Sequence, residues 1–491
     1  MAAEPGQLPT LSFFRTFWLT LALGVSVSAC VGATNPVTGE RDWTVVDEQR
    51  ELELGHEAHP GILNLYGYYD NPRLQEYVSQ VGQALVPHTH RPELDYRFTV
   101  LDTPMVNALA TPGYVYITRG MLALLNSEAE LAGVLGHELA HITARHTAQR
   151  IGQQQTVDII KLVLDVTVDS ALVDNAANIL GEAHLRGYGR ENELEADRLG
   201  ARYAALAGYD PEALLEVIRI LKDQESHEIK MARQEGREPQ VYHGLFATHP
   251  DNDDRLQEVI REANQHRSGS EVLVRREEYL RHVDGMAMGP AEFEGVLRGR
   301  HFYHRNYNFT LAFPEGWESQ NFPDRLIAQA PGRDMQIRLT LVERNARQPS
   351  CDFLHRRFEN LAQLRVRATE GFSGCQARVW DDRSAADILV LEHSPGIFLI
   401  AAAQSGRPEA FRRYAGAVQE TFQSLRPMTK AEYDAARPPK LRVVEAKVGD
   451  TYAAYAEGAD WDPYPEDQLR LFNAAYPSGE PIPGKPVKTI H

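Results

Sequence analysis

The chain has 491 residues, a hydrophobic content of 43% and a formal net charge of −17 at pH 7. Its length and ordinary apolar content are typical of a globular protein with about two to four domains. The negative charge disfavours a nucleic-acid-binding protein, because such proteins gather Lys and Arg to neutralise phosphates. We therefore expect no nucleic acid among its partners.

The N-terminus has the pattern of an export signal. Residues 17–29 are apolar and uncharged and follow Arg15, and this run is shorter than the ~20 residues that span a bilayer as a helix. It ends in V-S-A-C at Cys30, which resembles the lipobox of bacterial lipoproteins. The resemblance implies a signal peptide over 1–29, a lipid anchor at Cys30 and, because Val31 follows, the periplasmic face of the outer membrane. An uncleaved anchor and an ordinary secretory signal remain the alternatives.

A turn-rich tether is expected over residues 30–46, and one mainly helical domain over 47–268. Within that domain the pattern H-E-x-x-H stands at His137-Glu138-Leu139-Ala140-His141. Ser127 and Glu130 have the spacing of a capping box, and no Pro follows before Arg150, so the pattern predicts a helix that begins near Ser127.

Two His four residues apart share one face of a helix, where neutral imidazoles can bind a single zinc ion. Glu138 lies beside them and can take a proton from a water molecule that zinc activates. The chemistry indicated is peptide hydrolysis. Chance occurrence of so short a motif is the alternative, and the well-started helix argues against it.

A catalytic zinc usually has three protein ligands and one open position. Downstream, a second helical pattern opens at residues 190–197 and is rich in carboxylates. Glu193 and Asp197 share a face, so that one can bind the metal while the other holds a ligand His in its tautomer. Glu191 and Glu195 form a competing pair, and periodicity alone leaves the choice open.

The combination His137-Glu138-x-x-His141 and Glu193-x-x-Ala196-Asp197 resembles the HtpX and BepA type of zinc metallopeptidase (metallopeptidase family 48, gluzincins). The resemblance covers about residues 35–265. It implies one zinc ion per chain, with Glu193 as the third ligand and Asp197 in support. It also implies that residues 107–120 form an edge strand to which the substrate backbone adds.

Two further His stand near or after these motifs. Thr248-His249-Pro250 with Arg255 resembles a late loop of the same family, which implies that His249 caps the zinc or contacts substrate and that Arg255 steadies the oxyanion. His146 follows His141 by five residues, about 140° further round a continuing helix. A structural or solvent-facing role is therefore expected for His146, rather than a fourth ligand.

A linker is expected over 269–300, including a charged helix over 270–281. The sequence pattern changes after it. Residues 301–430 alternate in the manner of strands, with helical patterns at 351–363 and 409–425, which predicts an α+β domain. Its turn at Pro314-Glu315-Gly316-Trp317 resembles the PsbP-like fold, and a binding or scaffolding role is expected. If Cys30 is lipidated, Cys351 and Cys375 remain as an even pair for a disulfide.

Residues 431–491 complete the chain. Val448-Gly449-Asp450-Thr451, a later Asn473 and Gly484 resemble a degenerate LysM repeat, a module that binds N-acetylglucosamine glycans such as peptidoglycan. A structural cap is the alternative.

The expected fold class is thus α+β and multidomain: a mainly helical zincin core with a small edge sheet, an α+β domain and a small LysM-like module. The expected function is a zinc endopeptidase of the bacterial cell envelope that acts on misfolded or stalled envelope proteins. The alternative is a latched periplasmic assembly chaperone or cell-wall-binding scaffold.

Overall fold

The computed structural model describes residues 33–42, 46–151, 189–237, 272–291 and 294–491, and only scattered residues between 239 and 266. Short gaps inside these ranges fall at 323–324, 346–347, 359, 381–384 and 460. The predicted signal peptide, Cys30, His249 and Arg255 lie outside the described residues. Within the described ranges, no helix combines the length and apolar character needed to cross a membrane.

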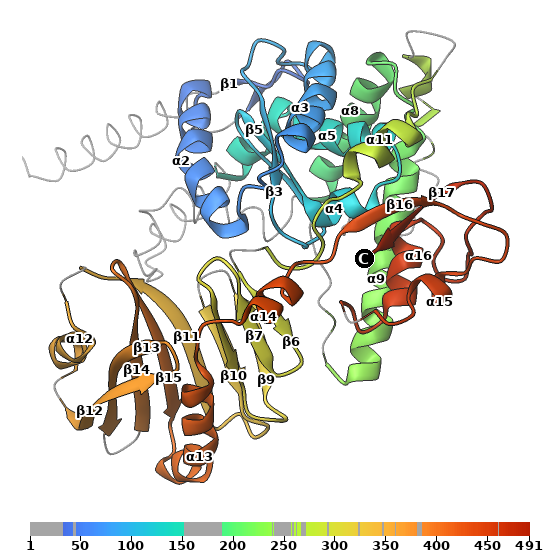
Figure 1. Cartoon of the computed structure of the whole chain (residues 1–491). Coiled ribbons are helices and arrows are strands. Elements are labelled where there is room, and N and C mark those ends of the chain that lie inside the picture. Colours follow the sequence, from blue (N-terminus) through green and yellow to red (C-terminus); the bar gives the residue numbers. More distant parts are fainter. Residues whose placement is uncertain are drawn as a thin grey trace, which may run out of the picture. The chain divides into compact units, whose positions relative to one another are not determined.

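The described residues form two compact units, drawn in Figure 1. The first comprises Met1–Met286 together with Leu441–His491, and the second comprises Ala287–Lys440. The C-terminal segment therefore packs with the predicted peptidase residues, although a whole domain separates the two in sequence.

The first unit is mainly helical, with a small sheet. Its strands β3, β5 and β4 lie in that order, with β3 parallel and β4 antiparallel to β5. The β4–β5 turn is Pro112-Gly113, and Gly113 has a φ of +82°, as position i+2 of a type II turn requires. The elements are β1 (Ala33–Thr34), β2 (Arg41–Asp42), α2 (Glu48–Tyr66), α3 (Pro72–Leu85), η1 (Val86–His88), β3 (Arg97–Leu101), β4 (Ala108–Thr111), β5 (Tyr114–Thr118), α4 (Arg119–Leu124), α5 (Glu128–Thr143), α8 (Arg190–Leu206), α9 (Ala213–Glu235) and α11 (Arg276–Val283).

Helix α5, which carries H-E-x-x-H, begins as its sequence predicts. The Ser127 hydroxyl accepts the Glu130 amide, while the Glu130 carboxylate accepts the amide of Asn126 at 2.6 Å. Every residue of α5 is buried, so the helix is enclosed on all sides rather than amphipathic. It packs against α8, α9, α3 and β4.

The helical pattern that runs on toward Arg150 is interrupted at Ala144 and Arg145, and helical backbone resumes at His146. Helix α5 ends at Thr143, and Arg145 takes a left-handed conformation with a φ of +60°. The guanidinium of Arg145 is buried against Glu51 of α2, with Nε 2.9 Å from the carboxylate, and it also donates to the carbonyl of Val46. These contacts hold a strained backbone that redirects the chain.

Two other helices differ from their predicted bounds. Asp210-Pro211 in the sequence predicts a helix over 210–222 with Pro at its first position. The structure has α9 there, which begins later, after a turn in which Asp210 accepts the Glu212 amide. Helix α9 runs on to Gly236, whose φ of +68° is typical of a left-handed helix stop. The linker helix expected over 270–281 is the shorter α11.

The C-terminal segment contains β16 (Leu441–Glu445), α15 (Tyr452–Tyr455), α16 (Pro465–Phe472) and β17 (Pro486–Ile490), with β16 and β17 antiparallel. Lys488 of β17 is buried. Its ammonium donates to the carbonyls of Ala123 and Leu125 at the end of α4, at 2.6 and 2.8 Å. Carbonyls at a helix C-terminus favour a cation, so this contact ties the segment to α4.

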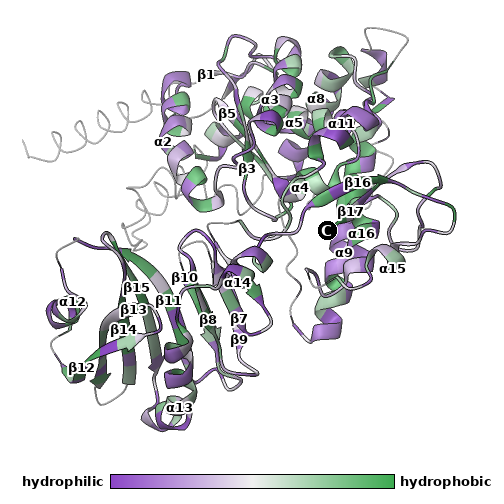
Figure 2. Cartoon of the chain, in the orientation of Figure 1, coloured by the Kyte–Doolittle hydropathy of each residue, from purple (hydrophilic) through white to green (hydrophobic). Residues whose placement is uncertain are grey.

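The second unit contains a three-stranded sheet and a seven-stranded antiparallel sheet in the order β12-β13-β14-β15-β11-β10-β9. Strand β15 is hydrophobic along most of its length (Figure 2). The elements are β6 (Val296–Arg298), β7 (His301–His304), β8 (Phe309–Ala312), β9 (Glu318–Phe322), β10 (Arg325–Gln329), β11 (Gln336–Glu343), α12 (Ser350–Arg357), β12 (Leu361–Thr369), β13 (Phe372–Trp380), β14 (Ala385–Ser394), β15 (Ile397–Ser405), α13 (Pro408–Ser424) and α14 (Lys430–Ala435).

Helices cover both faces of this larger sheet. Phe411 and Phe422 of α13 share a core with Leu389 of β14, whereas Leu354 of α12 packs with Val390 on the opposite face. The helix expected over 351–363 is wrong in its second half, where β12 begins. Cys351 and Cys375 form a disulfide with their Cα atoms 5.1 Å apart, which fastens α12 to β13.

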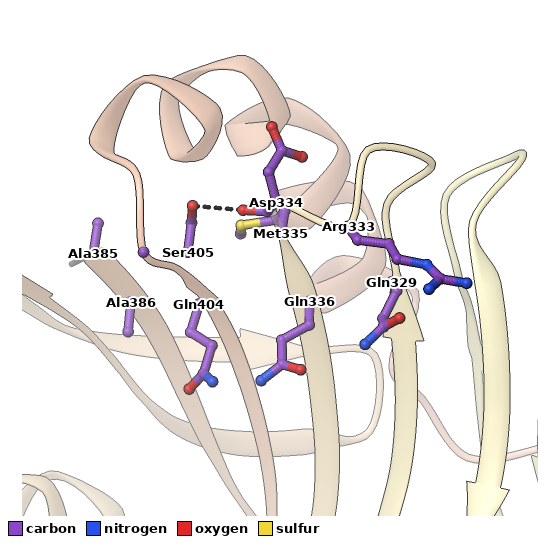
Figure 3. Close-up of a pocket in the computed structure, with 10 residues that line it drawn as sticks. Gln329, Arg333, Asp334, Met335, Gln336, Ala385, Ala386, Gln404 and Ser405 are labelled. Atoms are coloured by element: carbon purple, nitrogen blue, oxygen red, sulfur yellow. Dashed lines mark hydrogen bonds between the residues drawn. The ribbon is translucent and has the colours of Figure 1, made fainter. Parts of the chain in front are cut away.

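A pocket of about 430 Å³ opens at one end of the seven-stranded sheet (Figure 3). Gln329, Gln336 and Gln404 lie opposite one another on β10, β11 and β15, so their amide side chains share one face. Beside them the Ser405 hydroxyl donates to the carbonyl of Asp334 at 2.6 Å. The lining thus combines these polar groups with the apolar side chains of Met335, Ala385 and Ala386.

Candidate metal centre

Two glycines let the helices that carry the candidate ligands cross closely. Gly136 of α5 faces Gly200 of α8, and a Cβ on Gly200 would lie 2.6 Å from the backbone nitrogen of His137. Only a residue without a side chain fits there. The close crossing places Glu193, two turns before Gly200, beside both His of α5.

Three ligand atoms converge at this crossing. Nε2 of His137 and Nε2 of His141 are 3.0 Å apart, and Oε2 of Glu193 lies 3.4 and 3.9 Å from them. Tetrahedral zinc with bonds of about 2.1 Å separates its ligand atoms by roughly 3.4 Å. The cluster therefore has the spacing that a zinc ion requires.

The buried carboxylates at this crossing would also stabilise a bound cation. Oε2 of Glu193 is buried and has no hydrogen-bond partner among the described residues. Burial opposes a charge on His137, but the carboxylates of Asp197 and Glu193 outweigh it and raise the pKa of His137 to about 10. A site that draws a proton onto a ligand His is one where a metal ion can replace that proton.

Asp197 stands behind the first His. Its Oδ1 accepts a hydrogen bond from Nδ1 of His137 at 2.9 Å, and the pair is buried. This bond places the ring proton on Nδ1 and leaves Nε2 bare for a metal. Glu193 and Asp197, four residues apart on α8, thus face the two different ring nitrogens of His137.

Glu138 lies beside the cluster and is 2% exposed. Its burial, together with the charge of Glu193, raises the pKa of Glu138 to about 8, while His137 acts in the opposite direction. A carboxyl group whose pKa lies near neutrality can both accept and return a proton.

The two remaining carboxylates of α8 differ. Glu191 is exposed, whereas Glu195 accepts a hydrogen bond from Nε2 of His146 at 3.1 Å. His146 itself is fully buried, and its Nδ1 lies 2.8 Å from Nδ1 of His141. The solvent-facing alternative for His146 is therefore wrong, because the left-handed backbone at Arg145 separates α5 from a new helical turn that begins at His146.

The sequence pattern predicted nothing for Gly200 or the Arg145 turn, and it did not predict that His146 contacts Glu195. A Gly in the middle of a helical pattern was the available signal for the crossing. The buried Arg145–Glu51 pair had no local signal, since its partners are far apart in the chain.

Comparison with known proteins agrees with this geometry. Residues 72–263 match the model of Peptidase family M48. The "Beta-barrel assembly-enhancing protease" of Escherichia coli (strain K12) is 29% identical over 276 residues, which are 52% of this chain and 54% of that protein. The "Mitochondrial metalloendopeptidase OMA1" of Arabidopsis thaliana is 29% identical over 196 residues, 40% of this chain and 38% of that protein.

The chain therefore contains a zinc metallopeptidase domain of family M48. It spans about half the length of the curated relatives it matches, or less. A solved structure, "Solution Structure of Cyanobacterial PsbP (CyanoP) from Synechocystis sp. PCC 6803", aligns with a TM-score of 0.21 and 13% identity over 27% of this chain and 95% of its own. That score is too low to carry an argument, and the PsbP-like resemblance stays a prediction.

Proposed function

We propose that this protein is a zinc-dependent endopeptidase of the bacterial cell envelope that cleaves misfolded or stalled envelope proteins. The observation that carries the proposal is the buried cluster of His137, His141 and Glu193, with Glu138 beside it and Asp197 behind it. Its relatives' names, a beta-barrel assembly-enhancing protease and a metalloendopeptidase, support the same class of reaction.

Zinc, when bound here, supplies a Lewis acid that lowers the pKa of water toward about 7. Glu138 accepts the proton of the attacking water while the water oxygen bonds to the peptide carbonyl carbon. Glu138 then returns the proton to the leaving nitrogen, and the C–N bond breaks to give an amine and a carboxylic acid, which loses its remaining proton to solvent or to the amine. Asp197 holds His137 in the tautomer that presents Nε2 throughout.

Strand β4 supports a mode of substrate binding. It lies at the edge of its sheet and packs against α5, so an extended peptide that adds to it would run beside the metal cluster. His249 and Arg255 keep their proposed roles, contact with zinc or substrate and stabilisation of the oxyanion.

The envelope location rests on the predicted signal over 1–29 and the lipid anchor at Cys30. The Cys351–Cys375 disulfide supports it, because such bonds persist in oxidising compartments. Peptidoglycan binding through residues 431–491 is part of the proposal, and the strand–helix–helix–strand order of β16 to β17 supports a LysM-like module.

The test is cleavage of an unfolded protein by the zinc-loaded protein beside its Glu138→Gln variant. The variant should keep its zinc and lose at least about 10²-fold in kcat. Equal turnover by the two proteins would remove Glu138 as the base. If neither protein cleaves the substrate although both bind zinc, the second candidate function is favoured.

That second candidate is a latched peptidase that works mainly as an assembly chaperone or scaffold. One observation favours it. His137, His141 and Glu193 are 0%, 3% and 5% exposed, and every residue of β4 is buried, as expected of a site that is covered at rest. Repair of an envelope defect by the Glu138→Gln variant would favour this scaffold role.

A further inference from the structure

His141, the second candidate zinc ligand, is backed by an arrangement unlike that behind His137. Asp197 accepts directly from His137. Behind His141 stands another imidazole, His146, and behind His146 stands the carboxylate of Glu195. His141, His146 and Glu195 are therefore linked by two successive hydrogen bonds, which run from the metal cluster to the partly exposed Glu195 of α8.

When His141 is a metal ligand, each hydrogen bond from His141 to His146 to Glu195 needs one donor and one acceptor, and this fixes where the ring protons lie. The Nε2 of His141 faces His137 and Glu193, so Nε2 must be bare and Nδ1 must carry the proton. Across the 2.8 Å contact with His146, that proton needs a bare Nδ1 as its acceptor. Neutral His146 then carries its own proton on Nε2, which donates to Glu195.

Burial and the backbone turn at Arg145 fix the positions of His146 and Glu195. His146 is fully buried, and the Glu195 side chain is 22% exposed. The left-handed turn at Arg145 returns the chain so that His146 faces His141, and the Arg145–Glu51 ion pair of 2.9 Å holds this turn. The hydrogen bond between His146 and Glu195 therefore joins the turn after α5 to helix α8.

We propose that His146 and Glu195 are positioning residues for the zinc ligand His141. His146 accepts the Nδ1 proton of His141 and so fixes the tautomer and ring plane that present Nε2 to the metal, and Glu195 fixes the tautomer of His146. Partners of this kind commonly change metal affinity by 10–100-fold when removed. The inference rests on the zinc site of the proposed function.

The test compares zinc dissociation constants of His146→Ala, His146→Asn and His146→Gln in the full chain, measured by competition with a chelator. The Asn side chain can place an acceptor near the position of Nδ1, whereas Gln reaches only the position of Nε2. We expect zinc binding to weaken by about 10–100-fold in the Ala and Gln variants and by only a few-fold in the Asn variant. Glu195→Gln should weaken binding less than His146→Ala, and its control, Glu191→Gln, should bind as the wild type does.

Rescue by Asn alone is the result that a merely structural role for His146 would not give. Equal weakening by all three substitutions would mean that packing, not hydrogen bonding, is at stake, and wild-type affinity in all three would also overturn the inference. If His146→Ala does not fold, the contrast between Asn and Gln decides alone. A wild-type protein that binds no zinc would overturn the proposed function and this inference together.

Discussion

At the residue scale, each ring nitrogen of His137 and His141 has its own partner. One nitrogen of each ring faces the metal cluster, and the other is held by Asp197 or by His146. The sequence predicted both rings from their spacing, because two residues four apart on a helix always share a face. It could not choose between Glu193 and its neighbours, since that choice depends on how α8 is rotated against α5.

Asp197→Asn should weaken zinc binding by about 10–100-fold. An amide keeps the volume of the side chain, but it removes the charge that holds the Nδ1 proton of His137. The measurement is zinc competition with a chelator, and the circular dichroism of the variant controls for folding. Affinity equal to that of the wild type would show that Asp197 does not support the site.

At the scale of elements, the site depends on the crossing of α5 and α8. A Cβ on Gly200 would meet the backbone of His137 and of Gly136, at 2.6 and 2.9 Å, and backbone cannot give way as a flexible side chain can. The sequence shows Gly136 and Gly200 but not that they face each other, because their pairing is a tertiary contact.

Gly200→Ala should therefore separate the two helices, with a cost of about 1–3 kcal/mol in the free energy of unfolding and a loss of zinc affinity. Gly416→Ala is the matched control. Gly416 also lies inside a helix, α13, where no described atom lies within 4 Å of a new Cβ, and Ala there should be neutral or stabilising. Chemical denaturation and zinc titration give both readouts, and a Gly200→Ala protein with wild-type values in both would refute the argument.

Contacts between elements also explain why the sequence did not predict the end of α5. Residues 144–151 contain no Gly or Pro, and helical backbone resumes at His146, so nothing in the local sequence marks the end of α5 at Thr143. The end is imposed by the buried contacts of Arg145 with Glu51 and Val46, which lie about a hundred residues earlier. Tertiary contacts of this kind override local propensity.

At the scale of the whole molecule, the C-terminal segment belongs to the peptidase unit. The ammonium of Lys488 is buried among carbonyls at the end of α4, just before the capping residue of the metal-binding helix. Burial lowers the pKa of Lys488, and the nearby charge of Glu130 acts in the opposite direction. Sequence patterns indicated a separate module here, since nothing local signals a contact across more than 360 residues.

Lys488→Met should lower the free energy of unfolding by about 3 kcal/mol, because carbonyls at the end of α4 lose a buried donor and Glu130 loses a nearby cation. Lys485→Met, at an exposed position of the same segment, is the control and should be nearly neutral. Denaturant unfolding followed by circular dichroism measures both. A stable Lys488→Met protein would show that the segment does not support α4.

The central claim is that His137, His141 and Glu193 together bind one zinc ion. X-ray absorption at the zinc edge of the zinc-loaded full chain tests it most directly. We predict one zinc per chain, with the scattering of the His137 and His141 imidazole rings, joined by a third ring where His249 caps the metal, and with oxygen as the remaining ligands, at about 2.0–2.2 Å. A zinc site with sulfur ligands, or one whose imidazole scattering is unchanged by the double substitution His137→Ala and His141→Ala, would contradict the account.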